Sequence, residues 1–262
     1  MGNVAIIGCG NLGKSILNGL LEGNSFAPEQ IIATKRNLKG LENFEESGIT
    51  ITSDNAYAIT NSKVVVLALK PHQMLPFLNE FENTFTKDHI VISLATGITI
   101  AQLESGLKNP GTVVRAMPNT ATTILESITC ICMNNEDEGH RQWVSKIFDE
   151  LGETVFINED LMESATVLGA CGIAFVLRFM RAMVQGGIQI GFSADIAGKI
   201  VNQTVKGAAE LLMQNGEHPE FEIDKVTTPR GCTIAGLNEM EHNGFSSALI
   251  KGIVASYEKI EK

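Results

Sequence analysis

The 262-residue sequence has few cysteines and an excess of negative over positive charge. Its five cysteines are an odd, scattered set without the C-x-x-C or Cys/His spacing of a zinc site, so we expect reduced thiols, a cytoplasmic protein and no metal. The 20 basic residues stand against 30 acidic ones, and the resulting net charge of −10 argues against binding to nucleic acid or to anionic membranes. An anionic ligand must therefore be held by a local site.

Long hydrophobic runs are also scarce. The run Val4–Ile7 has no basic flank, so we expect a strand there and no signal peptide. The longest uncharged apolar stretch, residues 166–177, is shorter than the roughly 20 residues that cross a bilayer. We therefore expect a buried helix at this stretch and no membrane contact. With 44% hydrophobic and 19% charged residues, the composition is that of a globular protein.

The first 157 residues alternate short β-rich segments with helical ones, such as residues 13–21 and 141–151. The predicted strands are Val4–Ile7, Ile31–Thr34 and residues 49–52, 64–69, 90–94, 113–117, 128–133 and 154–157. Residues 64–69 are apolar on both faces, which is typical of a parallel strand covered by helices on each side. The alternation predicts an α/β Rossmann domain over residues 1–157, with a doubly wound, mostly parallel sheet.

After residue 158 no strand is predicted. The stretches 161–190, 194–214 and 233–262 are long and apolar, which indicates an all-α domain over residues 158–262. The first stretch is apolar nearly all round, so its burial requires more than its own domain. We predict that a second subunit supplies that burial in an intertwined helical homodimer.

A glycine-rich turn, GCGNLG at residues 8–13, follows the first predicted strand and opens the first predicted helix. In that position the first glycine allows a tight turn, the second lets the backbone approach a pyrophosphate, and the third lets the helix pack on the strand. The amides at the start of the helix then face the phosphates. This context favours a dinucleotide site over an ordinary turn, formed by Ile7, Gly8, Cys9, Gly10, Asn11 and Leu12.

The second predicted strand indicates which dinucleotide binds. An NAD site would place an acidic residue at its end, but here the strand ends in Thr34, Lys35 and Arg36, and the next acid is Glu42. Two cations and a hydroxyl suit a 2′-phosphate, which Arg36 can bind with two hydrogen bonds, although a solvated basic turn has the same composition. We predict a preference for NADP(H), with NAD(H) as the alternative.

Four further segments carry a family resemblance: VVVLALKPHQM at residues 64–74, ISLATGI at 92–98, RAMPNT at 115–120 and VTTPRGCTI at 226–234. In this order they resemble the pyrroline-5-carboxylate reductases over almost the whole chain. The resemblance implies reduction of a cyclic imine by NADPH to give L-proline, the last step of proline biosynthesis, by a homodimer or a higher oligomer of dimers. The additional cofactor-binding residues that it implies are Asn55, Ala68, Leu69, Lys70, Pro71, Ala95, Thr96, Met117 and Asn119.

The same resemblance implies that backbone amides of the 226–234 loop hold the substrate carboxylate. The substrate-binding residues so implied are Thr228, Gly231, Cys232 and Thr233. The hydroxyl of Thr233, the expected catalytic residue, would face the ring nitrogen, although its position before an apolar stretch also fits a helix N-cap. A protonated imine accepts a hydride without a strong general acid, and the five histidines have no Asp or Ser partner at a catalytic spacing.

Two departures from the family pattern leave alternatives open. Residues 170–174, ACGIA, lack the family's serine and proline, and Arg230 stands where a loop glycine is usual. Arginine is strained if this position needs a positive φ, or else its guanidinium adds a charge that binds the carboxylate. The alternative functions are a reductase of a related cyclic imine and an NADPH-binding sensor without turnover. A β-hydroxyacid dehydrogenase is disfavoured, because in that family a lysine on the interdomain helix takes the proton of the alcohol. Here no lysine lies between Asn158 and Gly198.

Overall fold

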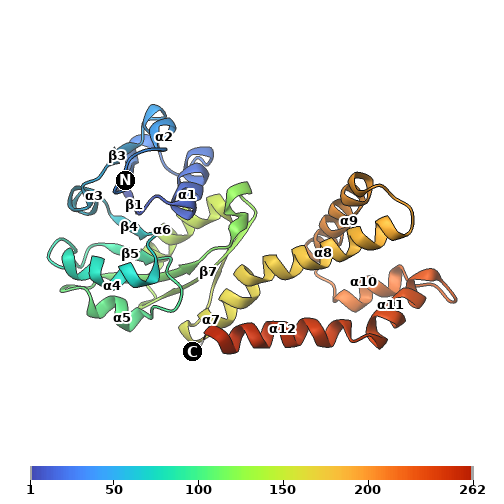
Figure 1. The fold of residues 1–262 in the computed structure, drawn as a ribbon. Helices are drawn as coiled ribbons and strands as arrows, with labels where there is room; N and C mark the ends of the chain where they lie inside the picture. Colours follow the sequence, from blue (N-terminus) through green and yellow to red (C-terminus); the bar gives the residue numbers. More distant parts are fainter. Residues whose placement is uncertain (1, 261–262) are drawn as a thin grey trace. The chain divides into compact units, whose positions relative to one another are not determined.

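Two compact units make up the computed structural model, which describes residues 2–260 (Figure 1). The first unit extends through Cys171, and the second comprises Gly172–Lys259. Residues 158–171 therefore pack with the sheet-containing unit, and Met162 is fully buried in an apolar cluster on that sheet.

An eight-stranded sheet forms the centre of the first unit, in the order β3-β2-β1-β4-β5-β6-β7-β8. The strands are β1 Val4–Ile7, β2 Ile31–Thr34, β3 Thr50–Thr52, β4 Val64–Leu67, β5 Ile90–Ser93, β6 Thr112–Met117, β7 Ser127–Met133 and β8 Gly152–Phe156. Neighbouring strands pair in parallel except β6 with β7, which are antiparallel. The predicted Rossmann-type, mostly parallel sheet is confirmed, and no strand end is shifted by more than two residues.

Helices cover both faces of this sheet (Figure 1). One face packs against α1 (Asn11–Glu22), α2 (Glu42–Glu46) and α6 (Glu138–Phe148). The other packs against α3 (Asn55–Thr60), α4 (Pro71–Glu80), α5 (Ile100–Ser105) and α7 (Met162–Ala165). Strands buried on both sides explain the continuous apolar runs in the sequence, because alternate residues of each strand enter opposite layers of the core.

The second unit is entirely helical, as the sequence predicted. A π-helical turn, Thr166–Cys171, joins α7 to α8 (Gly172–Gln189). The helices that follow are α9 Ala194–Asn215, α10 Pro219–Lys225, α11 Cys232–His242 and α12 Phe245–Ile260. The apolar stretch 233–262 is interrupted at Gly244, whose φ of 77° is a left-handed conformation that glycine adopts without strain.

The helical stretch Glu159–Gln189 differs from the expectation in two ways. It has 31 residues, and its most apolar 18-residue window has a mean hydropathy of 1.8, so by length and composition alone it is long enough and apolar enough to cross a membrane. The sequence suggested otherwise because the uncharged run ends at Arg178, whereas the helix continues through it. The stretch is also not buried within the chain, since only 6% of its most apolar window is covered.

Apolar side chains of the second unit are exposed both on this stretch and on other helices. Val176 and Leu177 on α8 are 48% and 58% exposed, and Ile250 on α12 is 60% exposed. A groove of about 430 Å³ between α8 and α12 is lined mainly by apolar side chains, among them Phe179 and Leu249. Exposed apolar surface of this extent marks an interaction site.

Candidate cofactor and substrate sites

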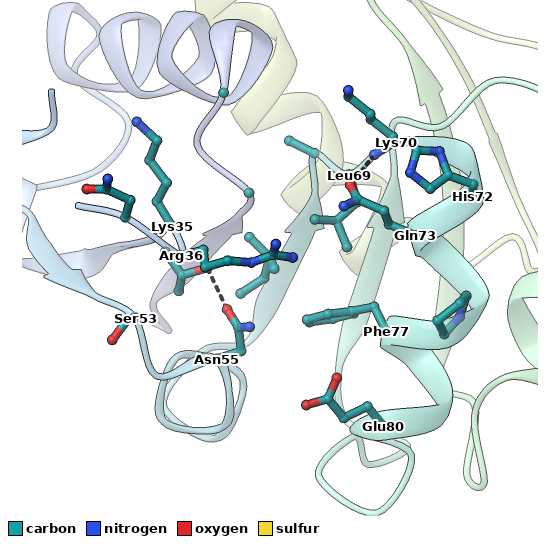
Figure 2. Close-up of a pocket in the computed structure, with 17 residues that line it drawn as sticks. Lys35, Arg36, Ser53, Asn55, Leu69, Lys70, His72, Gln73, Phe77 and Glu80 are labelled. Carbon is teal, nitrogen blue, oxygen red and sulfur yellow. Dashed lines mark hydrogen bonds between the residues drawn. The ribbon is translucent and has the colours of Figure 1, made fainter. Parts of the chain in front are cut away.

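A cavity of about 800 Å³ lies at the carboxyl ends of β1, β2 and β4 (Figure 2). In open α/β sheets a ligand binds at this edge, where the strand order reverses, and the volume suits a dinucleotide-sized ligand. The predicted cofactor residues that line the cavity are Ile7, Gly8, Gly10, Thr34, Lys35, Arg36, Asn55, Ala68, Leu69 and Lys70. The structure thus brings together residues that lie more than 60 positions apart in the chain.

The three glycines of the turn have distinct roles in the packing. A Cβ atom at Gly8, whose φ is 90°, would lie 2.9 Å from the carbonyl oxygen of Ala68. A Cβ at Gly13 would lie 2.9 Å from the carbonyl oxygen of Gly8. By contrast, a Cβ at Gly10 would meet nothing within 4 Å, so this residue faces open space.

Helix α1 begins beside that open space. Its N-cap is Gly10, which makes no side-chain cap hydrogen bond, so the amides of the first turn have no intrahelical acceptor. Free amides and the positive end of the helix dipole bind phosphate groups. The turn therefore fits the pyrophosphate of a dinucleotide.

The residues at the end of β2 differ in how they are engaged. The Thr34 hydroxyl donates a hydrogen bond to Oδ1 of Asn55 at 2.7 Å, and the Lys35 ammonium donates to the carbonyl oxygen of Lys39 at 2.8 Å. Within residues 2–260, Arg36 has no hydrogen bond or ion pair, and its side chain extends across the cavity towards α4 (Figure 2). The Arg36 guanidinium is therefore free to bind an anionic group in the cavity.

One wall of the cavity was not predicted from the sequence. It is formed by α4 side chains at positions 72, 73, 76, 77 and 80, and Asn37 and Ser53 also contribute to the lining. Positions 73, 76, 77 and 80 are three or four residues apart and so share one helix face. That spacing, directly after the Lys70–Pro71 turn, is the sequence signal that would have found them.

Three predicted cofactor residues lie beside the cavity without lining it. Asn11 and Leu12 are the first residues of α1, and Pro71 is the first residue of α4. At the glycine turn, it is Gly8 and Gly10, and not the side chains of Asn11 and Leu12, that line the cavity.

Cys9, the remaining predicted residue of the turn, also does not line the cavity, and both its thiol and its amide have partners within the protein. The side chain is fully buried and its Sγ donates to the carbonyl oxygen of Ile6, while its amide donates to the carbonyl oxygen of Thr34 at 2.9 Å. Burial raises the pKa of the Cys9 thiol to about 12. The thiol is therefore protonated at neutral pH and does not act as a nucleophile.

The other predicted cofactor residues lie at or just after the ends of β5 and β6, at the same edge of the sheet but outside the cavity lining. The Thr96 hydroxyl contacts Sδ of Met117 at 3.9 Å, which joins the loop 95–99 to the end of β6. Asn119 is buried and its side chain is occupied: Nδ2 donates to the carbonyl oxygen of Gly169 at 3.2 Å, and Oδ1 accepts from the amide of Ala121 at 3.0 Å. These two loops are therefore fixed by protein contacts.

The predicted substrate loop forms a tight turn in the second unit. The amide of Gly231 donates to the carbonyl oxygen of Thr228 at 2.9 Å, with Pro229 and Arg230 at the two central positions. Arg230 has a φ of 59°, so the strained alternative for this arginine is the one observed. A non-glycine residue in this conformation costs about 1–2 kcal/mol.

Helix α11 begins immediately after the turn, with Gly231 as N-cap and no side-chain cap hydrogen bond. The N-cap alternative for Thr233 is therefore wrong, because Thr233 lies in the first helical turn, where Cys232 precedes it. Its hydroxyl has no hydrogen-bond partner in the described part of the chain. The free first-turn amides and this hydroxyl form a small polar site suited to a carboxylate and one further polar group.

Comparison with known proteins decides the family. The family model described as pyrroline-5-carboxylate reductase dimerisation matches residues 159–262, and the model described as NADP oxidoreductase coenzyme F420-dependent matches residues 3–97. Pyrroline-5-carboxylate reductase 2 of Dictyostelium discoideum is 44% identical over 276 residues, covering 99% of this chain and 92% of that protein. This chain belongs to the pyrroline-5-carboxylate reductase family.

Further members of the family agree in sequence and fold. Pyrroline-5-carboxylate reductase 1 of Dictyostelium discoideum is 45% identical over 98% of this chain, which spans 49% of that longer protein. The solved pyrroline-5-carboxylate reductase of Coxiella burnetii matches with a TM-score of 0.93 at 30% identity, over 99% of this chain and 97% of that one. The Plasmodium falciparum pyrroline carboxylate reductase, solved with NADP bound, matches at 0.87 and 25% identity, over 98% and 96%.

The contrast between Gly10 and Gly13 gives a prediction for cofactor binding by this chain. Gly10→Val places a branched side chain in the open space beside the α1 amides, so we expect NADPH affinity to fall at least about tenfold, or about 1.4 kcal/mol, with little change in the melting temperature. Calorimetric titration and thermal unfolding measure the two quantities.

Gly13→Ala is the matched control. Its Cβ would press on the Gly8 carbonyl, so we expect a loss of about 1–3 kcal/mol in the free energy of unfolding, which exceeds the gain in helix propensity. A Gly10→Val variant that binds NADPH as tightly as the wild type would contradict the placement of the pyrophosphate.

Proposed function

We propose that this chain is an NADPH-dependent pyrroline-5-carboxylate reductase, which converts 1-pyrroline-5-carboxylate to L-proline in the last step of proline biosynthesis. The observation that carries the proposal is the 44% identity to a reductase of that name over 99% of the chain. Bound NADPH supplies a hydride to C5 of the cyclic imine, whose protonated nitrogen becomes the amine of proline. The chain has to orient two ligands and arrange charge around them.

Residues 1–157 are proposed as the cofactor domain. The turn at residues 8–13 binds the pyrophosphate through amides, and Arg36 binds the 2′-phosphate; both are supported by the open space at Gly10 and the unpaired guanidinium. The remaining proposed cofactor residues are Ile7, Cys9, Thr34, Lys35, Asn55, Ala68, Leu69, Lys70, Pro71, Ala95, Thr96, Met117 and Asn119. NADH, which lacks the 2′-phosphate, is the weaker donor.

Residues 158–262 are proposed as the substrate-binding and dimerisation domain. The first-turn amides of α11, at Cys232 and Thr233, bind the substrate carboxylate together with Thr228 and Gly231 of the preceding turn. The Thr233 hydroxyl hydrogen-bonds to the ring nitrogen and orients the imine. Because the imine is already protonated, this hydroxyl assists as a positioned polar group and no strong acid is needed.

The exposed helix at residues 159–189 is proposed to be covered by a second copy of the chain, not by lipid. Arg178 and Arg181 interrupt its apolar surface, and a charged side chain at the centre of a bilayer is costly. Exposed apolar residues on other helices, such as Ile200 and Ile250, support association of dimers into a higher oligomer. The five free thiols fit a reducing cytoplasm, and the net charge of −10 fits a protein without nucleic-acid partners.

Turnover tests the proposed function directly. We expect the purified protein to oxidise NADPH when 1-pyrroline-5-carboxylate is added, with proline as the product. The oxidation is measured as a loss of the absorbance of reduced nicotinamide at about 340 nm. A six-membered cyclic imine in a parallel assay tests ring size. Tight NADPH binding without turnover on either imine would indicate a sensor and refute the proposal.

Arg36→Ala tests the 2′-phosphate site. Loss of a charge-assisted hydrogen bond costs about 1.5–3 kcal/mol, so we expect NADPH to bind about 10–100-fold more weakly while NADH affinity is nearly unchanged. Lys39→Ala, a cation of the same loop that does not line the cavity, is the control and should leave both affinities as they are. Equal losses for the two coenzymes would place the 2′-phosphate elsewhere.

Thr233→Ala tests the substrate hydroxyl. We expect kcat to fall by about one or two powers of ten, less than the loss of a true general acid or base, with NADPH affinity unchanged. Thr233→Ser keeps the hydroxyl and should keep most of the rate. A serine variant as slow as the alanine variant would show that the hydroxyl is not the group that matters.

A further inference from the structure

A buried arginine of β6 has no part in the proposed reaction. The Arg115 side chain lies on the face of β6 that also carries Val113 and Met117, both members of an apolar cluster, and it is only 2% exposed. Its Nη1 lies 3.0 Å from Oε1 of Glu159 and its Nη2 lies 2.9 Å from Oε1 of Glu163. Nε has no partner within residues 2–260.

These ion pairs offset a desolvation cost that is otherwise large for a buried arginine. Burial alone would lower the pKa of Arg115, but the hydrogen bonds with Glu163 and Glu159 outweigh it and the pKa is raised. The guanidinium is thus charged, and it lies between two carboxylates that would repel each other without it.

Glu159 also reaches a second element. The same Oε1 that binds Arg115 accepts a hydrogen bond from the amide of Ile100 at 2.6 Å. Ile100 is the first residue of α5, directly after the loop 95–99. One carboxylate oxygen therefore ties β6 to the end of that loop.

A separate contact ties the end of β6 to the same connecting segment. The Asn119 side chain donates to the carbonyl oxygen of Gly169, which lies in the π-helical turn where the backbone hydrogen bonding departs from the α-helical pattern. Loops 95–99 and 117–119 carry the proposed cofactor residues that lie farthest along the sheet from the phosphate sites at β1 and β2, so we assign them to the nicotinamide end of the cofactor. Each is thus attached to residues 159–171, the first through the Ile100 amide that follows it and the second through Asn119. Thr96 and Met117 contact each other between these attachments.

We propose that Arg115 is a positioning residue for the nicotinamide end of the cofactor site, an inference that rests on the proposed function. By pairing with both carboxylates it holds Glu159 on the Ile100 amide and so fixes loop 95–99 against loop 117–119. Without the guanidinium, the carboxylates repel, Glu159 leaves the amide and the loop loses its attachment. Hydride transfer is sensitive to placement, because a shift of about 1 Å can cost about a hundredfold in rate.

The test compares Arg115→Met with Val114→Ala. Val114 is the neighbouring fully buried residue and packs in the core cluster on the opposite face of the sheet, so both variants are expected to lose stability. Only Arg115→Met should lower kcat, by about 10–100-fold, with the dissociation constant of NADPH changed less than about threefold, since the phosphate end is untouched. Arg115→Lys, which keeps one ion pair, should give an intermediate kcat. Equal kcat for Arg115→Met and Val114→Ala overturns the proposal.

Amide hydrogen exchange provides a readout that needs neither substrate nor cofactor. Exchange across residues 95–105 should accelerate in Arg115→Met and in Glu159→Ala but not in Val114→Ala. Should Arg115→Met fail to fold, Arg115→Lys and Glu159→Ala carry both measurements. Unchanged exchange overturns the proposal even if the wild type is an active reductase. A wild type that lacks turnover refutes the proposed function separately, since the exchange comparison is made without ligands.

Discussion

Helix α1 starts so close to the ends of β1 and β4 that no Cβ atom fits at Gly8 or Gly13. This backbone contact is the constraint on which the rest of the first unit depends. It brings the first-turn amides of α1 to the carboxyl end of β1, which lies between β2 and β4 in the sheet. The cavity, the unpaired guanidinium of Arg36 and the wall formed by α4 are all arranged around that edge.

Much of the fold was predictable because its signals are local. Strands such as β4 are apolar on both faces, and this pattern identifies a parallel strand between two helical layers without any long-range information. The glycine turn and the basic end of β2 likewise lie within 30 residues of each other, so their order along the chain predicts the cofactor edge. Arg36 was identified in this way, and the structure finds its guanidinium without a partner among the described residues.

The parts that escaped prediction depend on distant pairs. Arg115 is buried because two carboxylates 44 and 48 positions later meet it, and no local pattern pairs those residues. The same holds for Asn119, whose amide is bonded to a carbonyl 50 positions later. The length of the exposed helix was missed for a different reason. Its apolar residues were recognised in the sequence, but the uncharged stretch ends at Arg178, whereas the hydrogen-bonded backbone of α8 continues through that residue.

The antiparallel pairing of β6 with β7 determines the path by which the chain leaves the sheet. Because β8 runs parallel to β7, it points away from the cofactor edge, and it ends level with Ile131 and hence with Ala116 of β6. The chain must then travel back along the sheet, passing Arg115 before it reaches Asn119. Had β7 and β8 run in the same direction as β1–β6, β8 would end at the cofactor edge itself and this return segment would have nothing to span. The reversed direction that β7 and β8 share thus leaves the segment after β8 to run back beside β6, where Glu159 binds Arg115 and Gly169 binds Asn119.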